Sequence, residues 1–373
     1  MLVKGAIHVI QLHRIKEVAG HMSAASLDAL IIGPNTDLAY LAGLTPLSDE
    51  RFKALVILND GRFFHICPEL YYEETREALG PAADIFVWSD TDGFLGAAEA
   101  ANQKYEMDHM TIGVNDAVRA VDLLSLRTVT RGRFEIGTSV LEEVRVCKDA
   151  EERGFLREAA RLADEVAVEV LPFIHAGVTE GEVKKKIGEL FTMKGAPELA
   201  FETIVASGPN SSRPHYTGGE RVIAGQDVVV LDFGCRYHGY CSDTSRMVFV
   251  GEPTDEQRKI YDIVLKANLA GERTARVGAT AGDVDAAARD VIESAGYGAN
   301  FLNRTGHGIG MADHEAPYIK HGNPLVLQDG MAFSVEPGIY LAGRFGMRVE
   351  DIVLIDGGTA ETLNRSPKDI TIL

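Results

Sequence analysis

The sequence predicts an α+β protein of two domains, and three observations lead to this fold class. The chain has 373 residues, which corresponds to two domains at roughly 100–200 residues each. From Ile10 to Ser139, short apolar runs alternate with helix-like stretches. After that segment, helical and strand patterns follow one another in the order helices, strands, helices, strands. We therefore predict one domain over residues 1–145 and a second over residues 146–373.

The first domain is predicted to be α/β. Its strands are expected where short apolar or aromatic runs are bounded by turn residues, namely over 27–33, 54–58, 62–66, 84–88, 111–114 and 133–137. Helices are expected between several of them, over 36–44, 70–79 and 92–106. The polar residues of this domain do not converge on a recognisable chemistry, so the function is expected in the second domain.

The second domain is predicted to begin with a long helix. Its apolar residues recur at helical spacing, and Asp149 precedes them as a predicted N-cap. A second helix over 179–195 opens with Thr179 and Glu182 in the capping-box pattern. Two further helices (255–275, 281–296) interrupt β-rich segments at 201–208, 227–251, 330–341 and 346–358. This order predicts two similar halves in one antiparallel sheet with helices on one face.

Composition and charge exclude several classes of partner. The formal net charge is −18, which disfavours nucleic-acid binding and anionic membranes. No stretch approaches the roughly 20 apolar residues of a membrane span. The first 20 residues lack a long apolar run with a cleavage site, so no signal peptide is expected. The four cysteines are scattered and read as reduced thiols, which predicts a cytoplasmic protein.

Four carboxylates occur within apolar strand patterns. Asp232 ends the run Val228–Leu231, and Asp243 enters the next strand of the same predicted hairpin. Glu336 and Glu350 occupy similar positions in two later strands. A charge in a core strand costs several kcal/mol unless it is paired or binds a metal. Facing strands are about 4.8 Å apart, so the carboxylates would lie close together and repel one another without a cation.

A histidine-containing, glycine-rich segment lies between the two hairpins, and it supplies His307 as a fifth donor. Four carboxylates and one histidine suit a pair of hard or borderline divalent ions. Two alternatives remain open from the residues alone. Each carboxylate could instead pair with an arginine, since Arg246 and Arg348 are near in sequence. A separate zinc site is also conceivable in the first hairpin, from its residues Cys235, His238 and Cys241.

Five segments together resemble one known family. They are FETIVASGPNSSRPH, LDFGCRYHGYCSDTSR, TGHGIGMADHEAP, FSVEPGIY and MRVEDIVLI, in this order. In this combination they resemble the "pita-bread" metallopeptidases, the group of methionine aminopeptidase, proline-specific aminopeptidase, prolidase and creatinase. The N-terminal segment LDALIIGPNTDLAYLAGL resembles the start of the creatinase-like N-terminal domain of the proline-specific branch. The resemblance implies a pita-bread fold over 146–373, preceded by the smaller α/β domain.

The resemblance also implies a role for each matching residue. Asp232 would be a terminal ligand of one metal, Asp243 and Glu350 would bridge both metals, and His307 and Glu336 would complete the second. Glu336 would in addition handle the proton of the attacking water. Further roles are implied for four residues near the ligands: His215 and His314 would line the substrate site and assist catalysis, and Tyr340 and Arg348 would support the ligands and substrate.

The activity that the resemblance implies is hydrolysis of the peptide bond before proline, in short proline-containing peptides. An Xaa-Pro dipeptidase is expected first. The alternatives are an Xaa-Pro aminopeptidase acting on longer peptides, and a lyase or small-amide hydrolase on the same scaffold. A pure binding role is a weaker alternative. The cofactors would be two divalent ions, with Mn²⁺ favoured by the carboxylate-rich ligands and Co²⁺ or Zn²⁺ as alternatives. A homodimer is expected from the same resemblance.

Overall fold

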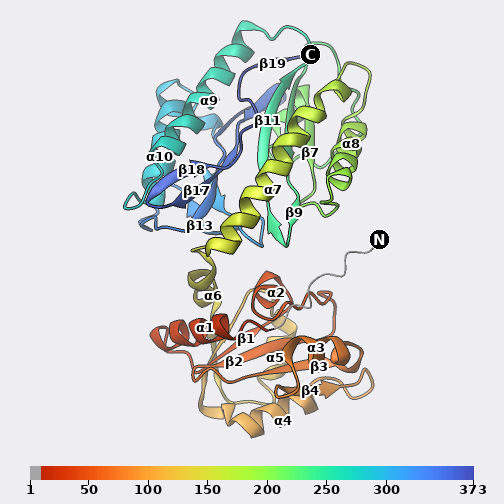
Figure 1. The fold of residues 1–373 in the computed structure, drawn as a ribbon, viewed down its shortest axis with the longest axis vertical. Helices are drawn as coiled ribbons and strands as arrows, with labels where there is room; N and C mark the ends of the chain where they lie inside the picture. Colours follow the sequence, from red (N-terminus) through yellow and green to blue (C-terminus); the bar gives the residue numbers. More distant parts are fainter. Residues whose placement is uncertain (1–9) are drawn as a thin grey trace. The chain divides into compact units, whose positions relative to one another are not determined.

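A computed structural model describes residues 10–373 of the chain (Figure 1). Residues 1–9, which carry part of the segment used for the signal-peptide expectation, lie outside the described residues. Contacts divide the chain into two compact units, one ending at Arg145 and the other spanning Val146–Leu373. In residues 10–373, no helix is long and apolar enough to cross a membrane.

The N-terminal unit contains a six-stranded mixed sheet in the order β4-β3-β2-β1-β5-β6. Strands β1–β2 and β2–β3 pair antiparallel, and β3–β4, β1–β5 and β5–β6 pair parallel. The strands are β1 (Ala29–Ile32), β2 (Ala54–Leu58), β3 (Phe63–Pro68), β4 (Asp84–Trp88), β5 (Thr111–Val114) and β6 (Arg133–Ile136). All six lie at or within the predicted segments or extend them by at most two residues.

The helices of this unit are α1 (Leu12–Ala24), α2 (Thr36–Ala42), η1 (Glu69–Tyr71), α3 (Tyr72–Leu79), α4 (Leu95–Tyr105), η2 (Met107–His109), α5 (Ala120–Leu126) and α6 (Thr138–Arg145). Helices α1, α5 and α6 were not predicted. Helix α1 buries one apolar stripe, with Ile15, Val18 and Met22 at helical spacing. Polar residues between these positions obscured the pattern in the sequence.

The C-terminal unit contains a four-stranded sheet (β19-β11-β8-β7) and a five-stranded sheet (β13-β12-β14-β17-β18). The strands are β7 (Ile204–Ser207), β8 (Val228–Phe233), β9 (Arg236–Tyr237), β10 (Tyr240–Cys241), β11 (Thr244–Phe249), β12 (Gly306–Gly308), β13 (Glu315–Ile319), β14 (Ala332–Val335), β15 (Gly338–Leu341), β16 (Phe345–Arg348), β17 (Asp351–Asp356), β18 (Thr359–Thr362) and β19 (Thr371–Ile372).

The predicted single antiparallel sheet is thus divided into two, which are joined by an isolated antiparallel bridge between Ser245 and Glu350. The pairing is also not antiparallel throughout, because β19 at the chain end pairs parallel to β11. The α+β fold class itself is confirmed. Because the two sheets meet at Glu350, residues of both can contribute to one site.

The helices of this unit are α7 (Ala150–Glu169), η3 (Leu171–Phe173), α8 (Glu180–Met193), η4 (Gly208–Ser212), α9 (Asp255–Thr274), α10 (Ala281–Ser294) and η5 (Gly298–Asn300). Helices α7 and α8 begin with complete capping boxes, at Asp149/Glu152 and Thr179/Glu182. Each box satisfies backbone N–H groups that lack partners at a helix start. Both predicted N-caps are therefore confirmed.

Side-chain alternation along β8 decides where the site lies. Val229, Leu231 and Phe233 belong to a core shared with α7 and α8. The intervening residues Val228 and Val230 pack in a second core with residues of α9. Because successive side chains of a strand point to opposite faces, Asp232 lies on the face opposite α7 and α8.

Candidate metal centre and active site

The five predicted metal ligands come from both sheets of the C-terminal unit. Asp232 lies on β8 and Asp243 directly precedes β11, in the four-stranded sheet. His307 lies on β12, Glu336 directly follows β14, and Glu350 directly precedes β17, in the five-stranded sheet. All five side chains line one cavity of about 630 Å³. The structure therefore brings together residues that are up to 118 positions apart in the sequence (232 to 350).

The ligand atoms of Asp243, His307 and Glu350 all lie within 4.8 Å of one another. His307 Nε2 is 3.7 Å from Asp243 Oδ2 and 3.3 Å from Glu336 Oε1. Its other ring nitrogen, Nδ1, is 3.1 Å from the carbonyl oxygen of Gly308. A histidine that ligates a metal usually donates its second ring N–H to such an acceptor, which directs the free nitrogen toward the ion.

Several carboxylate oxygens in this cluster lack a partner. Asp232 Oδ1, Asp243 Oδ1 and Glu350 Oε1 are buried and accept no hydrogen bond. Buried polar atoms without partners are costly, and buried carboxylates normally pair or coordinate a cation. The donor set therefore fits divalent metal ions, which would satisfy these oxygens and offset the crowded negative charge.

The pKa values of the cluster reflect burial and mutual repulsion. Burial, followed by the charge of Glu350, raises the pKa of Asp243 well above its usual value. Burial likewise raises the pKa of Glu350, with a further contribution from Glu336. The pKa of Glu336 rises to about 7, mainly through burial, although Arg348 opposes the increase. Burial, then the neighbouring His314, lowers the pKa of His307 to about 3, so its imidazole is neutral and able to bind a cation.

Arg348 and Tyr340, predicted as supporting groups, lie against the ligands. The buried Arg348 guanidinium pairs with Asp232 and donates to Tyr340 Oη at 2.8 Å. Its Nε donates to Ser245 Oγ at 2.9 Å, and that hydroxyl donates to Glu350 Oε2 at 2.7 Å. Tyr340 is buried behind Arg348 and is not among the residues that line the cavity. It therefore fixes Arg348 rather than facing the cavity.

His215 and His314, for which the resemblance implies a place in the substrate site, both line this cavity. The His314 ring lies 3.8 Å from the His307 ring, centroid to centroid. Burial lowers the pKa of His314, and Arg304 adds to this effect while Asp313 opposes it. A neutral His314 can donate a hydrogen bond from one ring nitrogen and accept a proton at the other, at the edge of the carboxylate cluster.

Sequence reasoning missed several residues of the cavity wall. Arg304 lines the cavity, and its Nη2 is 3.3 Å from His314 Nδ1. Its guanidinium also lies 4.8 Å from the centroid of the Tyr318 ring. The signal in the sequence that could have indicated Arg304 as a site residue was its position three residues before His307. The remaining unpredicted wall residues are Phe201, Glu202, Ile204, Thr217, Asn303 and Asp313.

The separate zinc site considered in the first hairpin does not assemble. Cys235 Sγ faces the carbonyl of Ala159, and Cys241 Sγ faces that of Met311. His238 stacks on Phe155 at a ring distance of 4.9 Å. Within residues 10–373, these three side chains form no group with metal-ligand spacing.

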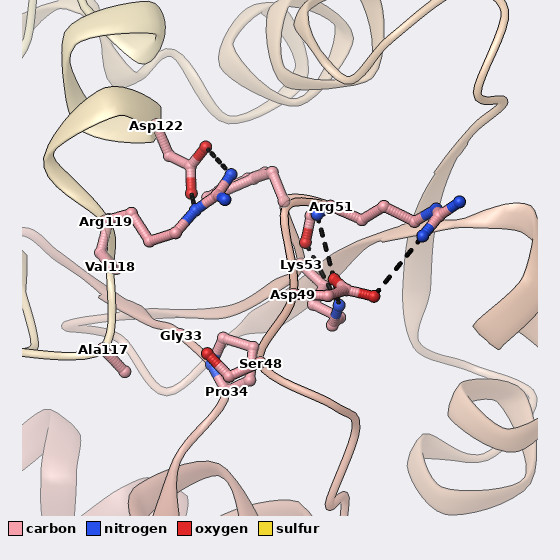
Figure 2. Close-up of a pocket in the computed structure, with 11 residues that line it drawn as sticks. Gly33, Pro34, Ser48, Asp49, Arg51, Lys53, Ala117, Val118, Arg119 and Asp122 are labelled. Carbon is pink, nitrogen blue, oxygen red and sulfur yellow. Dashed lines mark hydrogen bonds and ion pairs between the residues drawn. The ribbon is translucent and has the colours of Figure 1, made fainter.

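The N-terminal unit has a pocket of its own, near Gly33 and Lys53 (Figure 2). Lys53 Nζ lies 2.5 Å from Asp49 Oδ1, and Arg119 Nε donates to Asp122 at 2.8 Å. The cations that Figure 2 shows are thus paired with neighbouring carboxylates. Their charges are already compensated, and the C-terminal cavity is the stronger candidate for chemistry.

Comparisons with known proteins agree with this geometry. Residues 154–357 match the model of metallopeptidase family M24, and residues 14–147 match the creatinase/prolidase N-terminal domain. The chain is 36% identical to probable dipeptidase PepE of Mycobacterium tuberculosis, over 96% of each chain. It is 35% identical to the Xaa-Pro dipeptidase of Lactobacillus helveticus, over 92% of this chain and 94% of the relative.

Among solved structures, a prolidase from Thermococcus sibiricus aligns with a TM-score of 0.92 at 33% identity. The alignment covers 96% of this chain and 98% of that prolidase. Two family models and near-complete coverage of both sequences agree with the pita-bread fold and the creatinase-like domain predicted from the sequence. The chain therefore belongs to metallopeptidase family M24 and is a metal-dependent hydrolase of the prolidase type.

Proposed function

We propose that this protein is an Xaa-Pro dipeptidase, which hydrolyses the bond before proline in dipeptides. One observation carries the proposal: five donors converge in the cavity, and three of their buried carboxylate oxygens have no partner. Such an arrangement is costly unless cations occupy it. The substrate class comes from the similarity to the Lactobacillus Xaa-Pro dipeptidase and the Thermococcus prolidase.

Two divalent ions would be held by Asp232, Asp243, His307, Glu336 and Glu350. When bound, such ions lower the pKa of a water molecule and polarise the scissile carbonyl. We favour Mn²⁺ over Co²⁺ or Zn²⁺, because four of the five ligands are carboxylates and none is a thiolate.

Glu336 would act as the proton carrier. It lines the cavity beside His307, at 3.3 Å, and would accept a proton from the attacking water and then release it to the proline nitrogen. Protonation of that nitrogen is required because the leaving group is otherwise a poorly stabilised amide anion. His215 and His314, on the cavity wall, would donate hydrogen bonds to the carbonyl oxygen as negative charge develops on it.

Arg304 favours a dipeptide over a longer substrate. It lines the cavity and forms no carboxylate ion pair among the described residues, unlike Arg348, which is buried against Asp232. An arginine can bind a carboxylate through two parallel hydrogen bonds. In a dipeptide, the proline carboxylate lies directly next to the scissile bond, within reach of such a group. In a longer peptide, this position is an amide.

The first experiment compares hydrolysis of Ala-Pro with that of Ala-Pro-Ala, using chelator-treated protein with and without Mn²⁺. We expect metal-dependent cleavage of the dipeptide. Preference for the tripeptide would assign an aminopeptidase. No cleavage of either peptide by metal-loaded protein would reject the peptidase assignment for these substrates. Glu336→Ala should reduce kcat by about 10²–10⁴-fold, the range for a lost general acid–base.

Arg304 can be tested separately with Arg304→Met. We expect KM for Ala-Pro to rise by about 10- to 150-fold, because a hydrogen bond to a charged group contributes about 1.5–3 kcal/mol. Ala-Pro amide lacks the carboxylate and is the matched control. Its slow cleavage should be the same in the wild type and the variant, and an equal loss for both substrates would exclude carboxylate recognition by Arg304.

We further propose a cytoplasmic location and a homodimer. None of the four cysteines, all of which lie within the described residues, forms a disulfide, which is usual in reducing compartments. The homodimer rests on the resemblance to the proline-specific branch. Light scattering coupled to size-exclusion chromatography would measure the mass directly, and the monomer mass is 40.4 kDa.

A further inference from the structure

A buried ionic network lies behind the strands that carry Glu336 and Glu350, and it includes the C-terminal segment of the chain. Lys368 Nζ lies 2.6 Å from Glu272 Oε1 and 2.5 Å from Asp351 Oδ2. It also donates to Asn268 Oδ1 at 3.0 Å. Asp351 is fully buried and directly follows Glu350. None of these partners is among the residues that line the cavity.

Asn268, on α9, connects this network to both ligand-bearing strands. Its side chain is fully buried, and Nδ2 donates to the carbonyl of Val335 at 2.9 Å and lies 3.5 Å from that of Val349. These two residues directly precede Glu336 and Glu350. The side-chain amide of Asn268 therefore contacts the backbone immediately before both Glu336 and Glu350.

Arg246 makes the corresponding contact from the other sheet. Its Nη1 donates to the carbonyl of Glu350 at 2.7 Å, and Nη2 donates to Asp351 Oδ1 at 2.7 Å. The same nitrogen reaches the carbonyl of Ser366 at 3.1 Å, in the C-terminal segment. The network thus holds the backbone on both sides of the Glu350 side chain.

The composition of the network argues against a role in stability alone. Two cations, Arg246 and Lys368, face two carboxylates, the half-buried Glu272 and the fully buried Asp351, so its formal charges balance. A well-packed apolar core is often as stable as a buried ion pair, because charges lose their hydration on burial. The hydrogen bonds of the network hold the backbone in a fixed position. This matters because a metal site requires its ligands to stay within about 0.5 Å of their productive positions.

We propose that Lys368 and Asn268 are positioning residues for the metal centre. By this account, the C-terminal segment sets the spacing of Glu336 and Glu350 through Asn268 and Asp351, without touching substrate or ion. The inference rests on the proposed two-metal function. Partners that orient metal ligands typically contribute 10–100-fold to metal affinity. Removing the Lys368 ammonium should therefore weaken ion binding more than an equivalent change elsewhere.

The test is Mn²⁺ titration of chelator-stripped full-length protein by calorimetry, comparing Lys368→Met with Lys194→Met. Lys194 is the matched control, because its Nζ also contacts two carboxylates, Glu165 and Glu169, each at 2.7 Å. The exposed fractions of the two lysine side chains are similar, 18% for Lys368 and 14% for Lys194.

We expect Lys368→Met to bind Mn²⁺ 10–100-fold more weakly, Lys194→Met to bind it as the wild type does, and Lys368→Arg to recover most of the affinity. Asn268→Ala keeps Lys368 and provides a second route, with the same expected weakening. Unchanged Mn²⁺ affinity in both Lys368→Met and Asn268→Ala would overturn the positioning inference but not the proposed two-metal function. A wild-type protein that binds no Mn²⁺ would instead overturn the proposed manganese centre.

Discussion

Replacing Arg348 with methionine tests how the carboxylate cluster is stabilised without metal. Among the arginines and lysines of the described residues, only Arg348 forms an ion pair with the cluster, through Asp232 and, at 4.0 Å, Glu350. Methionine has a similar length and retains the apolar contacts of the arginine stem. The variant therefore removes one buried positive charge and its hydrogen bonds to Tyr340 and Ser245.

The expected loss follows from the burial of this pair. Breaking a buried ion pair by removing one partner costs about 3–5 kcal/mol, because the other charge stays buried without compensation. In a domain of this size, 1 kcal/mol shifts the melting temperature by about 2–4 °C. We therefore expect metal-free Arg348→Met to melt about 6–20 °C below the metal-free wild type. Saturating Mn²⁺ should reduce this difference, because the ions supply the missing positive charge.

Calorimetric melting of both proteins, with chelator and with Mn²⁺, measures these shifts. Arg153→Met serves as the control, since Arg153 pairs with the more exposed Asp329 and Asp356. Such surface pairs contribute about 0.2–1 kcal/mol, so its melting temperature should change little and independently of metal. A loss in Arg348→Met that is the same with and without Mn²⁺ would refute the reasoning, because the arginine would then have only a packing role.

Three further predictions concern stability. Burial lowers the pKa of His65 to about 3, below the usual 6.5. The unfolded chain therefore takes up the proton first, and the folded protein loses stability as the pH falls below 6.5. In His65→Leu, about 2 kcal/mol of this loss at pH 5 should disappear, as measured by denaturant unfolding at pH 5 and 7.5. Gly306→Ala would place Cβ 1.9 Å from the Ser334 carbonyl oxygen, so we expect a loss of about 1–3 kcal/mol and weaker Mn²⁺ binding by titration. Thr179→Ala should cost about 1 kcal/mol through loss of the α8 cap, with Mn²⁺ affinity unchanged in the same assays.

The fold was largely predictable from local patterns. The capping boxes at Asp149 and Thr179 fixed two helix starts, because side-chain caps depend only on neighbouring residues. The carboxylates were detectable because a charge in an apolar strand is exceptional. The division into two sheets was not predictable, because strand pairing depends on long-range contacts such as the Ser245–Glu350 bridge.

The residues that surround the metal ligands were harder to predict from the sequence than the ligands themselves. Arg304 lies in a loop, where no periodicity indicates the direction of a side chain. Asn268 and Lys368 contact the ligand strands from α9 and from the C-terminal segment, 67 and 33 residues away from Val335. Nothing in a helix pattern distinguishes a buried Asn268 from an exposed one. Such contacts become visible only when the backbone is placed in three dimensions.

The division of the ligands between two sheets has a consequence for how the C-terminal unit opens. Asp232 and Asp243 belong to one sheet, and His307, Glu336 and Glu350 to the other, with one backbone bridge at their junction. Ions held by all five would add a cross-link between the two sheets, beside the contacts that Arg246 and Arg348 already make across the junction. Amide hydrogen exchange in β8 and β14 should then slow together on metal loading.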